Sequence, residues 1–431
     1  MGHLAFERHR LDNGLRVVLA PDSAAPIVAV NLWYDVGSRN ERPGRTGFAH
    51  LFEHMMFQGT ASVAKGEHFA TVQAAGGTLN ASTWCDRTNY FETLPSHELE
   101  TGLWLEADRM ANLLPAMTLE KLDNQRDVVK NERRSSMDNQ PYGSWDERIQ
   151  AAIFPVGHPY HHSTIGSMED LSAASLDDVK EFFATYYAPN NAVLSLAGDF
   201  EPGSALAAIE RHFGPLTPNG ALPPAPDGAL PDRLGGEVRD TVPDAVELPR
   251  VYLAYRIPPY GTDEFLPFEL ASDLLATGRA SRLYARLVRE QRLAQDIGAS
   301  VFPFAHGAAV LMAHATARPD LDIEILEAAL AAEIEDLATN GPTDDELERV
   351  RTLHASTIER GLEEVAERAD RLSQYTCLFD QPERINTEVG DYDRVSAEAI
   401  REALRDQLGP DNRYVLTFVP NGEDLADEEE D

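Results

Sequence analysis

The chain has 431 residues, 43% of them hydrophobic, and carries 72 acidic against 37 basic side chains, for a formal net charge of −35. This length is enough for two domains, and so acidic a chain excludes nucleic acid as a partner, because phosphate binding needs basic residues. No apolar run approaches the roughly 18 residues of a membrane helix and the start lacks a signal-peptide core, so we expect a cytoplasmic protein that is not membrane-bound.

Strand-like and helical segments alternate along the first half of the chain. Short apolar runs predict strands, and longer stretches with helical periodicity lie between them. The expected strands are 15–21, 27–36, 78–84, 89–95 and 191–200, and the expected helices include 98–113 and 118–134. The Pro/Gly-rich stretch 216–236 then predicts an interdomain linker.

The second half repeats nearly the same order of elements. Strands are expected at 250–258, 297–305, 307–316 and 413–420, and helices at 264–276 and within 320–380. Each half runs strand, helix, hairpin, helices, strand. This order predicts an α+β fold of two homologous α/β-roll domains from a duplication, each a mostly antiparallel sheet packed with helices. We place the domains at 1–215 and 237–422, and expect a solvated acidic tail at 423–431.

One helical segment, "FAHLFEHMMFQGT" at 48–60, combines an apolar stripe with a polar face. The stripe has the i, i+3, i+4, i+7 spacing of a buried helix face and consists of Phe48, Leu51, Phe52, Met55 and Met56. The opposite side carries His50, Glu53 and His54. Thr46 is a plausible N-cap and Gly59 a plausible C-terminal cap.

Two histidines at i and i+4 lie one helical turn apart, so both rings can reach one metal ion. Glu53 projects from nearly the same place as His50 and would lie beside a metal-bound water. Zinc lowers the pKa of such a water to about 7, and a neighbouring carboxylate can then take its proton and pass it to a leaving amine. The pattern therefore favours peptide hydrolysis, and the alternative is a helix whose polar face simply meets solvent.

His-x-x-Glu-His is also the signature of the inverzincins. With it, the blocks "YDVGSRNERPGRTGFAHLFEHMMFQGT", "GGTLNASTWCDRTNYFETLP", "NQRDVVKNERRSSMDN" and "HPYHHSTIGSMEDL" resemble the pitrilysin/insulinase family of zinc metallopeptidases over nearly the whole chain. The resemblance is strongest to single-unit, half-length members, such as the zinc-bearing subunit of the mitochondrial processing peptidase and bacterial heterodimeric peptidases. It implies one Zn²⁺ per chain and a peptide substrate.

A third zinc ligand must come from downstream, and spacing alone does not choose it. The candidates are Glu106, Glu120, Asp127, Glu132 and Glu147. The resemblance does choose, because family members carry the ligand in a helix of the form E-R-x-x-V-x-x-E, which "QRDVVKNE" matches at Glu132. The first glutamate of that pattern is Gln125 here. An amide can orient a ligand as an outer-shell group but cannot accept a proton, which leaves Glu53 as the base.

The segment "GGTLNASTW" resembles the family's edge strand, which pairs with extended substrate backbone. The resemblance assigns Asn80 and Ala81 as substrate contacts, and Asn80 could alternatively be a turn residue of a hairpin. An edge strand contacts main chain before side chains, so we expect broad specificity for unstructured peptides.

The remaining histidines and the cysteines carry no clear site. His158, His161 and His162 lie close together in sequence, but Pro159 and the lack of a regular repeat favour a loop over a metal site. Cys85 and Cys377 form neither a disulfide framework nor a metal spacing.

The last prediction concerns a partner. The resemblance implies that a second double-domain unit faces the zinc and supplies an arginine and a tyrosine to the substrate carbonyl. Alignment on "RLAQDIG" puts Val288 and Gln295 at those positions, with Arg289 or Arg292 as substitutes if the alignment slips. We therefore expect a heterodimer with a homologous chain that lacks the zinc motif. The alternatives are a homodimer that uses other donors, and a non-catalytic assembly subunit of the same fold.

Overall fold

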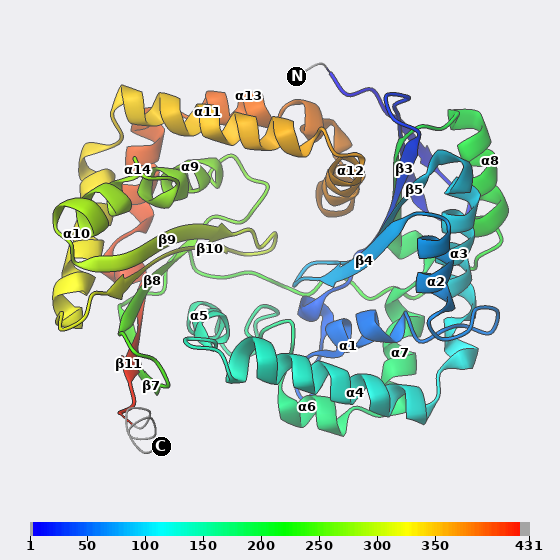
Figure 1. The fold of residues 1–431 in the computed structure, drawn as a ribbon, viewed down its shortest axis with the longest axis horizontal. Coiled ribbons are helices and arrows are strands. Elements are labelled where there is room, and N and C mark those ends of the chain that lie inside the picture. Colours follow the sequence, from blue (N-terminus) through cyan, green and yellow to red (C-terminus); the bar gives the residue numbers. More distant parts are fainter. Residues whose placement is uncertain (1–2, 423–431) are drawn as a thin grey trace, which may run out of the picture. The chain divides into compact units, whose positions relative to one another are not determined.

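The computed structural model describes residues 3–422 (Figure 1), so the predicted tail at 423–431 lies outside the described residues. The chain forms two compact units, each built from non-contiguous segments. The first unit takes in residues up to 132, 162–226 and 357–388, and the second takes in 133–161, 227–356 and the residues from 389 onward.

The first unit contains a six-stranded, mostly antiparallel sheet. Its strands are β1 (Glu7–Arg10), β2 (Arg16–Pro21), β3 (Ile27–Tyr34), β4 (Thr78–Thr83), β5 (Thr88–Pro95) and β6 (Ala192–Gly198). They lie in the order β1-β2-β6-β3-β5-β4, and β2–β6 is the parallel pair. Strand β4 is therefore at an edge of the sheet.

Helices cover both faces of this sheet, and β3 and β6 are therefore buried along nearly their whole length. Val30, Leu32 and Tyr34 pack into the main core of the unit, while Trp33 on the other face packs with Val193 of β6 and with Cys377 of a helix. That helix is α12 (Val365–Phe379), which lies across the sheet from α3 (Figure 1). The unit's helices are α1 (Phe48–Met55), α2 (Glu67–Ala74), α3 (Leu99–Ala116), α4 (Leu119–Arg133), α6 (Met168–Ala173), α7 (Leu176–Tyr186), α8 (Pro202–Phe213) and α12.

The second unit contains a five-stranded sheet in the order β7-β11-β8-β10-β9. Its strands are β7 (Val238–Asp244), β8 (Arg250–Ile257), β9 (Ala294–Phe302), β10 (Ala309–Ala317) and β11 (Arg413–Pro420). Its helices are α5 (Trp145–Ile153), α9 (Leu266–Ala276), α10 (Ile323–Asn340), α11 (Asp344–Gly361, ending in the first unit), α13 (Glu388–Asp393) and α14 (Ala397–Gln407). The π-helical turns 134–138 and 284–290 also belong to it.

The two sheets share one topology. Without β1, the first runs β2-β6-β3-β5-β4, and the second repeats that order five strands later, each with a single parallel pair, β2–β6 and β7–β11. The predicted fold class, two homologous mostly antiparallel sheets packed with helices, is confirmed. The linear domain boundaries at 215 and 237 stay a prediction, since the compact units interleave segments from both sides of them.

Two strands were not predicted from the sequence. β1 and β7 have largely exposed side chains, so neither carries the apolar run that identified the other strands. Among residues 3–422, the helices are too short or too polar to cross a lipid bilayer.

Candidate metal centre and peptide-binding edge

Helix α1 begins in a different way from the prediction. The N-cap is Gly47 in the left-handed region (φ 84°), not Thr46, whose hydroxyl donates to Asp170 at 2.6 Å. The buried carboxylate of Glu41 accepts from the N–H groups of Gly47 (2.8 Å) and Ala49 (2.7 Å). A carboxylate here satisfies helix donors that lack intrahelical partners, so Glu41 fixes the start of the motif helix from a distance in sequence.

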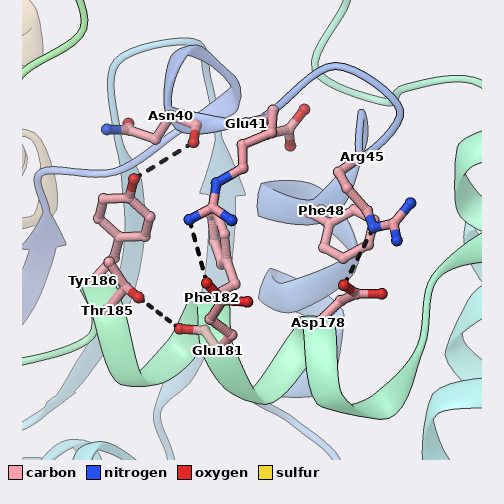
Figure 2. A pocket seen from close by; sticks show the side chains of 10 residues that line it. Asn40, Glu41, Arg45, Phe48, Asp178, Glu181, Phe182, Thr185 and Tyr186 are labelled. Carbon is pink, nitrogen blue, oxygen red and sulfur yellow. Dashed lines mark hydrogen bonds and ion pairs between the residues drawn. The ribbon is translucent and has the colours of Figure 1, made fainter. Parts of the chain in front are cut away.

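A pocket of about 60 Å³ lies beside this helix start (Figure 2). Segment 40–48 and helix α7 line it, and two ion pairs cross between them: Arg42–Glu181 at 3.2 Å and Arg45–Asp178 at 3.3 Å. Arg42 and Arg45 thus face carboxylates, while the third acidic group of the lining, Glu41, accepts from the N–H groups at the start of α1. The histidines of the motif are not among the lining residues, so the pocket is separate from the candidate metal centre.

The structure brings three predicted ligand side chains together. His50 Nε2 lies 3.7 Å from Glu132 Oε1, and His54 Nε2 lies 3.4 Å from Glu132 Oε2. The two imidazole centroids are 4.8 Å apart. Both rings come from consecutive turns of α1, and the carboxylate comes from the end of α4. One ligand atom from each residue lies within 4.8 Å of the others.

His50 and Glu132 are in the protonation state that binds a metal ion. Burial, together with His54, lowers the pKa of His50 to about 4, so its ring is neutral at pH 7 and can donate a lone pair. The hydrogen bond with His54 lowers the pKa of Glu132, which therefore stays ionised. Burial opposes protonation of His54, but Glu132 raises its pKa overall, so a bound metal would have to displace that proton. Two imidazoles and one carboxylate form a donor set that catalytic zinc sites use, with a fourth position open. The residues fit the group that the sequence predicts.

Glu53 lies on the same helix face and is held by the edge strand. The Thr83 hydroxyl donates to Glu53 Oε2 at 2.5 Å. Burial raises the pKa of Glu53, and the Thr83 hydrogen bond opposes that effect. Gln125, predicted as an outer-shell group, is buried and hydrogen-bonds His54, where it can orient the ring.

The other carboxylates considered as third ligand lie elsewhere. Glu120 and Asp127 are exposed, and Glu147 forms a bidentate pair with Arg133 at 2.7 and 2.8 Å. Glu106 is fully buried, where it pairs with Arg109.

Glu106 belongs to a second group with ligand-type atoms, which it forms with His68 and Glu92 inside the core. Burial lowers the pKa of His68 to about 2 and raises the pKa of Glu92 well above its usual range. The buried guanidinium of Arg109 already supplies this cluster with positive charge. We therefore assign the cluster to the packing of β5 against α3 rather than to a cation.

Strand β4 leaves a row of backbone groups free at the edge of the sheet. Trp84 N–H donates to Arg87 at 2.9 Å, and the alternation of an antiparallel ladder then turns Ser82 toward β5 and Ala81 away from it. Consistent with this, the Ala81 N–H contacts the side-chain oxygen of its neighbour Asn80 at 2.9 Å. Of the two predicted substrate contacts, Ala81 thus presents its backbone at the unpaired edge, whereas the backbone of Asn80 faces β5.

A buried polar group on the opposite face supports this edge, and sequence reasoning missed it. Asp370 of α12 accepts hydrogen bonds from Asn31 (2.9 Å), Trp33 (2.8 Å) and Asn89 (3.0 Å). Arg87 lies over the Trp33 ring, 5.1 Å from its centroid. The signal available in the sequence was an asparagine within the otherwise apolar run "IVAVNLWY".

The histidines of segment 158–162 and the two cysteines lie as follows. His158 and His161 lie in turns and bond the carbonyls of Gly228 (3.1 Å) and Phe154 (2.7 Å), and the three histidines of this segment form no ligand group among the described residues. Cys85 and Cys377 are buried, and they are not joined in a disulfide.

Val288 lies in the π-helical turn 284–290, and Gln295 is an exposed residue of β9. Neither is the arginine or tyrosine that the resemblance places there. Arg289, offered as a substitute, is exposed and lies 3.4 Å from Glu290.

Comparisons with known proteins agree with this architecture. Residues 16–160 match the family described as Insulinase (Peptidase family M16), and residues 173–353 match the Peptidase M16 inactive domain. The zinc protease PqqE of Helicobacter pylori is 30% identical over 408 residues, which cover 91% of this chain and 89% of that protein. An uncharacterized zinc protease of Mycobacterium tuberculosis is 27% identical over 424 residues, covering 97% and 94%.

Solved structures show the same fold. The crystal structure of a protease from Helicobacter pylori superposes with a TM-score of 0.91 at 28% identity, covering 96% of this chain and all of that one. A peptidase M16 inactive domain from Pseudomonas fluorescens superposes with a TM-score of 0.85 at 18% identity, covering 97% and 98%, and shares the fold alone. Sequence match, relatives and fold agree: this chain belongs to the insulinase family of peptidases, family M16.

Proposed function

We propose that the chain is a zinc-dependent endopeptidase, with His50, His54 and Glu132 as ligands of one Zn²⁺ and Glu53 as the proton acceptor. The observation that carries this proposal is the convergence of three ligand-type side chains beside a carboxylate that itself contacts the edge strand. Names of relatives as zinc proteases support the same reading.

The groups of the site have distinct tasks in this mechanism. Zinc, when bound, polarises the peptide carbonyl and lowers the pKa of a water toward 7. Glu53 accepts the proton of that water and later donates it to the leaving amine. The free edge of β4 aligns an extended peptide through main-chain hydrogen bonds, which favours flexible peptides and unfolded polypeptides over folded proteins.

The direct test replaces Glu53 by Gln in the full-length, zinc-loaded chain, assayed with its homologous partner if the wild type needs one. We expect cleavage of a flexible fluorogenic peptide to be lost, while zinc content stays at one per chain, because Glu53 is not assigned as a ligand. Glu120→Gln is the matched control, since Glu120 is an exposed residue of α4. Undiminished turnover by folded, zinc-loaded E53Q would refute the role of Glu53.

We further propose that the working form is a heterodimer. The support is Val288 and Gln295, which do not supply the arginine and tyrosine expected to hold the substrate carbonyl. A homologous chain without the zinc motif would provide them. Mixing the zinc-loaded chain with its co-purifying homologue tests this: activity should appear only on mixing, and equal activity of the isolated chain would contradict it.

A non-catalytic assembly subunit of the same fold is the second candidate. It is favoured by the match of residues 173–353 to an inactive domain, and α9, the counterpart of the motif helix, has no histidine. Metal analysis separates the two functions. Stoichiometric zinc after chelator-free purification supports the peptidase, and a folded, metal-free, inert chain supports the assembly role.

A further inference from the structure

Thr83 is the residue through which the peptide-binding edge contacts the proposed base. It is the last residue of β4, and its hydroxyl lies 2.5 Å from Glu53 Oε2. Leu79 and Ala81 on the same face of β4 pack against core clusters of the unit, so this face turns toward the helices. The side chain that reaches Glu53 is therefore directed by the pleat of the strand.

The backbone around Thr83 is held on both sides. Thr83 pairs with Thr88 across the hairpin, and the connection beyond it is closed by the Trp84–Arg87 hydrogen bond. Asp86 in that connection accepts from Arg39 at 2.7 Å, and both side chains of this pair are buried. The Thr83 hydroxyl is therefore held in place by the constrained backbone, whereas the Glu53 side chain has three rotatable bonds and can move.

Thr83 also borders the site where substrate would pair. By the ladder alternation that frees Ala81, the N–H and C=O of Thr83 point away from β5 as well. One residue thus offers its backbone to the open edge and its side chain to Glu53. Because the hydroxyl occupies Oε2, Oε1 is the oxygen left for the attacking water.

We infer that Thr83 is a positioning residue: it fixes one oxygen of Glu53 so that the other oxygen points at the water. Because Thr83 belongs to β4, the orientation of Glu53 is then set by the strand on which the peptide docks. This inference rests on the proposed peptidase function. It assigns to Thr83 an effect on the chemical step rather than on metal binding, since Thr83 contacts none of the three proposed ligands among its recorded hydrogen bonds.

The test compares Thr83→Val, which removes the hydroxyl but keeps a β-branched side chain, with Thr83→Ser, which keeps the hydroxyl. Thr78→Val is the matched control, because Thr78 lies exposed on the same strand with its side chain on the other face. All are full-length, zinc-loaded chains, assayed with the homologous partner if the wild type needs one. The readouts are zinc content, kcat and KM on a flexible peptide, and crystal structures of the zinc-loaded wild type and T83V.

We expect T83V to keep its zinc and its KM within about twofold but to lose roughly 10- to 100-fold in kcat, the scale of a misplaced catalytic group. T83S and T78V should stay near the wild-type rate, and the crystal structures should show Glu53 beside Thr83 in the wild type and turned away in T83V. Equal kcat for T83V and wild type, or an equal loss in T83S, would overturn the inference and leave the peptidase function standing.

Two further outcomes are separable. If the zinc-loaded wild type cleaves nothing with or without its partner, the proposed function fails, and an unchanged Glu53 position in T83V would overturn the positioning role independently. If T83V does not fold or loses zinc, Thr83→Ala takes its place: a lowered kcat at full zinc content supports the hydroxyl's role, and a kcat equal to that of the wild type refutes it.

Discussion

Ala81→Pro tests whether substrate pairs with the free edge of β4. Proline removes the Ala81 N–H and is tolerated where that group faces away from the sheet. In the free protein the substitution removes one exposed contact, with Asn80, so the free energy of unfolding should change by no more than about 1 kcal/mol. A docked peptide would lose one main-chain hydrogen bond and meet the proline ring.

The expected effect on catalysis is a rise in KM. A main-chain hydrogen bond contributes about 0.5–1.5 kcal/mol, and with the steric conflict the rise should be about tenfold or more. The neighbouring Ser82→Pro is the contrast, because the Ser82 N–H faces β5 and its loss leaves a buried ladder carbonyl unpaired. S82P should lower the free energy of unfolding by about 1–3 kcal/mol.

The assays are urea unfolding and Michaelis–Menten kinetics on one flexible peptide, with zinc content measured in parallel. If A81P is as active as the wild type, peptides do not pair at this edge. If A81P unfolds as easily as S82P, the ladder alternation assigned to β4 is wrong.

Three other predictions follow from side chains already described. Glu132→Gln should weaken zinc binding more than loss of an outer-shell partner does, which costs roughly 10–100-fold. Glu106→Gln should keep zinc, but it breaks a buried ion pair and should lower the free energy of unfolding by about 3–5 kcal/mol. Asp370→Ala should lower the free energy of unfolding by about 3 kcal/mol or more, because three donors lose their acceptor. The hydrogen bond from Arg282 lowers the pKa of Glu346 to about 2, so its stabilising effect should be full above about pH 4.5 and fade as the pH falls toward 2.

Each of these has a clear contrary result. Competition with a zinc chelator that finds equal affinity in E132Q and E106Q would remove the distinction between the two carboxylate clusters. A urea midpoint unchanged in D370A would show that the three donors find other partners. For Glu346, unfolding of wild type and E346Q is compared at pH 6 and pH 2.5, and a difference that grows on acidification would contradict the sign.

Local pattern in the sequence was enough to predict the motif helix and the main strands. The stripe from Phe48 to Met56 places His50, Glu53 and His54 on one face whatever the rest of the fold does. Glu132 needed the family resemblance, since periodicity left five carboxylates open. The structure now places it within 4 Å of both histidines.

Pairings across long sequence separations could not be predicted. Thr83 contacts Glu53 from 30 residues away, and Asp370 contacts Asn31 from 339 residues away. Neither residue carries a local signal, because a threonine ending a strand and an aspartate in a helix are ordinary in many folds. The prediction of Thr46 as the N-cap of α1 was wrong for a similar reason. Thr46 has a side chain suited to capping, but Glu41 reaches the N–H groups at the helix start from an earlier loop.

The interleaved chain path has a consequence for biosynthesis. The strands of the first sheet are complete once β6 has left the ribosome, yet the helix that covers one face, α12, lies far downstream. At roughly 5–20 residues per second, the about 180 residues between the ends of β6 and α12 take on the order of 10–40 s to translate. During that interval no α12 covers Trp33 and Val193, and Asn31 and Asn89 lack their hydrogen-bond acceptor, Asp370. A nascent chain that stalls near residue 215 therefore exposes one apolar face of the first sheet, which chaperones and proteases can bind.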